Sequence, residues 1–132
     1  MTKKEALQVL AILKAAYPSS YRDMTKEDAQ GTVSVWAMQF SDMPAEIVVM
    51  AIQKLIATNK FPPTVAEVKE KIKSIHWEAY ELIYTRNLEL PEATRDKYQK
   101  IYDVTAQYKY GTTYEPKIQQ MLPSFEQKQL GE

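Results

Sequence analysis

Helix-start signals recur along this chain and constrain its fold more than any other feature of the sequence. Thr2 with Glu5, and Thr64 with Glu67, have the spacing of a capping box, in which a hydroxyl and a carboxylate satisfy the first free backbone N–H groups of a helix. Thr25 is a further N-cap, with a carboxylate three residues later. Apolar residues follow each signal at intervals of three and four, which is the period of a helix that buries one face. The pattern predicts an all-α protein.

The first two helices have clear limits in the sequence. We expect the first over about residues 3–16, because Pro18 disfavours helical geometry at the residue before it. The second follows Thr25 and buries an apolar stripe at positions 33, 36, 37 and 40. Gly31 weakens this helix by about 1 kcal/mol relative to alanine. A close helix crossing is the physical reason to look for at that position.

Three further helices are expected along the rest of the chain. Pro44 suits the first position of the third helix, which ends near Asn59. Phe61 then stands in a rigid turn with two prolines after it. The fourth helix begins after Thr64, and nothing breaks its pattern until about Asn87, so it has room to continue as one long helix. The sequence leaves open whether the chain breaks near Ile75. A fifth is expected over about residues 91–110.

These segments divide the chain into three expected parts. Residues 1–75 form a small four-helix bundle, residues 76–110 a helical, tyrosine-rich extension, and residues 111–132 a flexible tail with room for a short helix. Seven of the nine tyrosines lie at position 80 or later. Tyr80 with Tyr84, and Tyr98 with Tyr102, share helix faces, which fits either packing between the last two helices or a protein interface.

Composition excludes several classes of function. Seventeen basic and seventeen acidic residues give zero formal charge, which argues against a broad basic surface for nucleic acid. The chain has no cysteine and one histidine, His76, so thiolate and multi-histidine metal sites are excluded. Three widely separated glycines cannot build a phosphate-binding loop. We therefore expect a non-catalytic protein without a cofactor, in which His76 is a structural or surface residue.

Localisation follows from the apolar pattern. No apolar stretch is long enough to cross a bilayer, and the first residues lack the pattern of a signal peptide. We expect a cytoplasmic protein with no membrane partner.

An apolar cluster near the end of the chain is the clearest candidate for a partner contact. Ile118, Met121, Leu122 and Phe125 have the spacing of an amphipathic helix. Such a helix fits a groove on a partner protein, or it docks back onto its own bundle. The sequence leaves both alternatives open.

Several short segments carry a resemblance to a known family. Residues 3–10, 15–18, 25–29 and 33–36 contribute to it, and residues 56–68 are the most specific part. There a helix is followed by Lys60-Phe61-Pro62-Pro63-Thr64 and then by Glu67. Over residues 1–75, this sequence resembles the phage replicative helicase loader and inhibitor family.

The resemblance implies a helical adaptor in phage DNA replication, acting in the cytosol of the bacterial host. Such a protein binds a hexameric replicative helicase, holds it inactive and delivers it to the origin through a replication initiator protein. From the zero net charge we expect direct binding of nucleic acid to be weak or absent. On this hypothesis we expect five helicase contacts in the tail: Tyr114, Ile118, Met121, Leu122 and Phe125. The alternatives are a small helical DNA-binding replication-initiation protein and an inhibitor of a host helicase loader.

Overall fold

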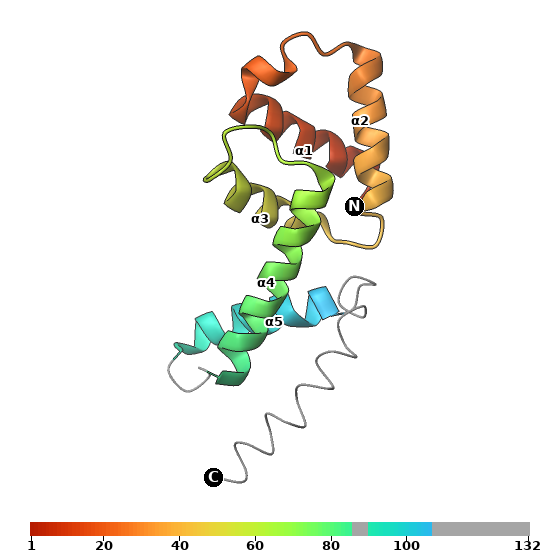
Figure 1. Ribbon diagram of the computed structural model, residues 1–132. Coiled ribbons are helices and arrows are strands. Elements are labelled where there is room, and N and C mark those ends of the chain that lie inside the picture. Colours follow the sequence, from red (N-terminus) through yellow and green to blue (C-terminus); the bar gives the residue numbers. More distant parts are fainter. Residues whose placement is uncertain (86–89, 107–132) are drawn as a thin grey trace, which may run out of the picture. The chain divides into compact units, whose positions relative to one another are not determined.

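The computed structural model describes residues 1–85 and 90–106, and within these ranges every regular element is a helix (Figure 1). The elements are α1 (Lys3–Ala16), the 3₁₀ helix η1 (Pro18–Tyr21), α2 (Lys26–Gln39), α3 (Ala45–Ile56), α4 (Val65–Thr85) and α5 (Glu92–Ala106). The predicted all-α fold is confirmed. The chain divides into two compact units, Met1–Glu78 and Ala79–Glu132, and the boundary falls within α4. The expected domain limits stay a prediction.

The predicted caps form at three helix starts. Thr2 and Glu5 make a capping box, since the Glu5 amide donates to Thr2 Oγ1 at 3.2 Å and the Thr2 amide donates to Glu5 Oε1 at 2.9 Å. The same reciprocal pair forms at the start of α2, where the N3 residue is aspartate. At the start of α4, the Glu67 amide donates to Thr64 Oγ1 at 3.2 Å. Each cap satisfies backbone donors that have no partner inside the helix.

Small differences from expectation have local causes. Pro44 is the N-cap of α3 and precedes the first helical residue, and its extended backbone (φ −64°, ψ 141°) fits that role. The connection after α1 contains η1, a single 3₁₀ turn that begins at Pro18. Its four residues are too few to show a period in the sequence. α4 runs unbroken for 21 residues, which settles the continuity that the sequence left open.

The first unit buries one face of each of its helices. α1 packs against α2, α3 and η1, and α2 lies beside α1 at one edge of the unit (Figure 1). The amino group of Met1 donates to the carbonyls of Phe40 and Met43 at 2.9 and 2.6 Å, which ties the start of α1 to the turn after α2. The buried apolar side chains of the unit are Ala6, Val9, Leu10, Leu13, Val33, Trp36, Phe40, Met43, Ile47, Val48, Ala51, Ile52, Leu55, Val68, Ile72 and Ile75.

The second unit contains the end of α4 and all of α5. Ala79 and Ile83 of α4 are buried, as are Ile101 and Thr105 of α5. The Thr105 hydroxyl donates to the Ile101 carbonyl at 2.9 Å, so this buried polar group is satisfied within its own helix.

Candidate functional site

The loop between α3 and α4 is held by side-chain hydrogen bonds. The Tyr17 hydroxyl, at the end of α1, donates to the Asn59 carbonyl at 2.9 Å. The Asn59 amide group donates to Glu67 Oε2 at 3.0 Å, and the Thr64 backbone amide donates to Glu67 Oε1 at 3.1 Å. Glu67 therefore caps α4 and anchors the preceding loop at the same time.

An exposed aromatic ring stands on this fixed loop. Phe61 is 69% exposed, whereas Pro63, two residues later, is buried. The ammonium of Lys60 lies 5.7 Å from the centroid of the Phe61 ring, within the range of a cation–π contact. A large ring on a backbone restrained by prolines loses little entropy when a partner covers it. Phe61 is thus an exposed ring on a loop that hydrogen bonds and two prolines restrain, which agrees with the rigid turn that the sequence predicts.

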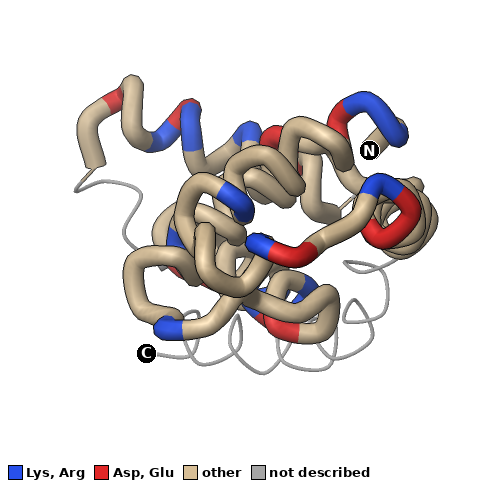
Figure 2. Tube along the Cα trace, turned by 90° about the horizontal axis from the view of Figure 1, so that it is seen from above, with Lys and Arg blue, Asp and Glu red and all other residues tan. Residues whose placement is uncertain are grey.

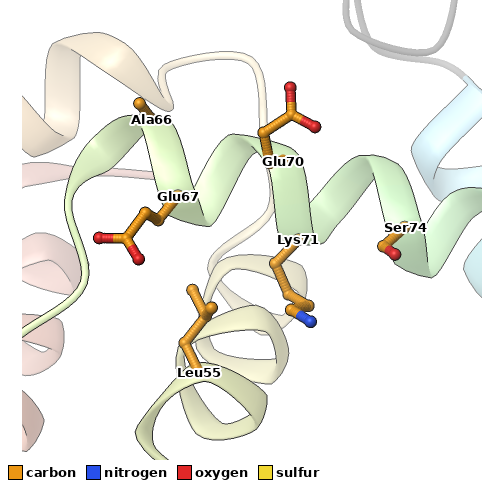
Figure 3. A pocket seen from close by; sticks show the side chains of 6 residues that line it. All are labelled: Leu55, Ala66, Glu67, Glu70, Lys71 and Ser74. Carbon is orange, nitrogen blue, oxygen red and sulfur yellow. The ribbon is translucent and has the colours of Figure 1, made fainter. Parts of the chain in front are cut away.

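A groove of about 460 Å³ lies between the end of α3 and the first half of α4. Leu55 from α3 points toward α4 between Glu67 and Lys71, and Ala66 and Glu70 of α4 also line the groove (Figure 3). Ser74 completes the lining one turn further along α4.

The groove carries charges of both signs at its rim. The pKa of Glu67 is lowered from its ordinary value, first because the Thr64 backbone amide donates to its carboxylate and then because the Asn59 side chain does. Leu55 and Ala66 are the apolar members of the lining, and the other four residues are polar or charged. Within residues 1–85 and 90–106, no group of three or more His, Cys, Asp or Glu residues is placed to hold a metal ion.

His76 is buried in the first unit, with only 2% of its surface exposed. Its ring meets the neighbouring Trp77 edge-on, with centroids 5.5 Å apart. This environment agrees with the structural role expected of it.

Tyrosines gather in the second unit. The rings of Tyr80, Tyr84 and Tyr102 contact one another, with centroid distances of 4.7, 6.0 and 5.9 Å for the 80–84, 80–102 and 84–102 pairs. We call these three residues the tyrosine cluster. Tyr84 remains 52% exposed, while Tyr80 and Tyr102 are half-buried. The cluster therefore packs α4 against α5 and still presents an aromatic surface, so both expected roles remain compatible with its geometry.

Two exposed apolar residues on α2 were missed by the sequence reasoning. Val35 is 46% exposed and Met38 is 65% exposed. The signal that could have found them is their spacing of three residues, on the side away from Trp36. The charged residues of α2 all lie in its first turn, and the turns behind it are uncharged (Figure 2). The five helicase contacts predicted in the tail lie outside the described residues. They are Tyr114, Ile118, Met121, Leu122 and Phe125.

Comparison with known protein families finds a match over the first part of the chain. A family model for the N-terminal domain of a phage helicase loader/inhibitor matches residues 1–69, which is more than half of the 132-residue chain. No curated protein and no solved structure matches the chain. No helix in the described ranges combines the length and apolar character needed to cross a membrane.

The matched family is one of adaptors and not of catalysts. Its match covers all the segments that carried the resemblance in the sequence, residues 3–10, 15–18, 25–29, 33–36 and 56–68, and with them the exposed Phe61 loop. This chain belongs to the phage helicase loader/inhibitor family.

Proposed function

We propose that this protein is a phage DNA-replication adaptor that binds a hexameric replicative helicase, inhibits it and delivers it to the origin. The family match over residues 1–69 is the observation that carries the proposal. An adaptor needs exposed contact surface and no catalytic cleft, and the Phe61 loop offers such a surface. It acts in the cytosol of the bacterial host, with a replication initiator protein as its second partner.

The proposed helicase contacts are the tail residues Tyr114, Ile118, Met121, Leu122 and Phe125. Their apolar members repeat at helical spacing, so a partner's groove would bury them together on one face. Binding of this kind couples folding to association and keeps the affinity moderate, which suits a loader that must release its helicase. Six copies around a ring would strengthen the engagement through multivalency.

The experiment is a binding and activity assay with purified replicative helicase at 0.3 M salt, where contacts driven by counterion release are weak. The unmodified chain should bind the helicase and suppress its ATP-dependent unwinding. A Leu122→Ala/Phe125→Ala double variant should lose both effects, while a Gln119→Ala/Gln120→Ala variant in the same segment should keep them. The melting temperatures of both variants should stay close to that of the unmodified chain.

Other outcomes would redirect the proposal. A large loss of melting temperature in the Leu122→Ala/Phe125→Ala variant would place those residues in the core. Binding to a cellular helicase loader without binding to the helicase would favour an inhibitor of that loader. Duplex binding that weakens steeply with salt, without helicase binding, would favour a DNA-binding initiation protein.

A further inference from the structure

We draw no further inference here: the strongest candidate, the exposed Phe61 ring on the restrained loop between α3 and α4 with the groove beside it, carries nothing beyond the site already described, because nothing in the structure shows what covers it.

Discussion

Replacing Gly31 by alanine should stabilise the first unit. Gly31 is an interior residue of α2, where glycine costs about 0.8–1.0 kcal/mol relative to alanine. No steric clash offsets the stabilisation from the better helix former, because a Cβ at position 31 would meet no atom of the described residues within 4 Å. The backbone needs no change either, because no described glycine has a positive φ. We therefore expect the free energy of unfolding to rise by about 1 kcal/mol, and the melting temperature by about 4–8 °C for a unit of this size.

The assay is urea and thermal unfolding followed by circular dichroism. Ser34→Ala is the matched control, since Ser34 is exposed on the same side of α2 and serine is a better helix former than glycine. Ser34→Ala should raise the free energy of unfolding by less than Gly31→Ala does. An unchanged or lowered stability in Gly31→Ala would refute the reasoning, because it would mean that another part of the chain already occupies the space beside Gly31.

Three further predictions test other parts of the structure. The carboxylates of Glu5 and Glu67 have pKa values lowered from 4.5, in each case first by a hydrogen bond from the backbone amide of the N-cap threonine. Their stabilisation is complete above the unfolded pKa and is lost as the pH falls through the lowered folded pKa. The melting temperature should therefore fall as the pH is lowered past about 4.5, and it should fall less steeply in Glu67→Gln than in the unmodified chain. Thermal unfolding from neutral to acid pH measures this, and equal dependence of the melting temperature on pH in the two proteins would contradict it. Tyr17→Phe removes the partly buried hydroxyl that donates to the Asn59 carbonyl at 2.9 Å. It should lower the free energy of unfolding by about 1 kcal/mol in urea titration, and an unchanged midpoint would disprove the tether. Tyr102→Leu removes two ring contacts, at 6.0 and 5.9 Å, and should lower hydrogen-exchange protection along α5 by about 0.5–1.5 kcal/mol; unaltered protection would show that the tyrosine cluster does not hold that helix.

Much of the fold was predictable because local chemistry decides where these helices begin and end. The limits of α1 follow from the Thr2 cap and from Pro18, and they need no tertiary information. The absence of glycine and proline from α4 allowed a continuous helix, but the sequence left a break within it open. The sequence did not predict that Val35 and Met38 are exposed apolar residues on α2. Apolar residues on both sides of a helix weaken the one-sided pattern that indicates an amphipathic face. The close helix crossing considered for Gly31 is absent from the described chain.

The candidate site was predictable only in part. The Phe61 turn was found because prolines mark it in the sequence. The groove beside it was not, because Leu55 meets residues of α4 only through the angle at which two helices cross, and a linear pattern does not record that angle. The tail contacts stay a prediction, since they lie outside the described residues.

The two methionines at the end of α2 and in the turn after it differ sharply in their access to solvent. Met38 is 65% exposed and Met43 is 6% exposed, so peroxide should oxidise Met38 well before Met43. A sulfoxide is polar, so it is tolerated at the exposed Met38 and disrupts packing at the buried Met43. Oxidation of Met43 should therefore mark the opening of the core between α1 and the turn after α2, whereas oxidation of Met38 needs no opening.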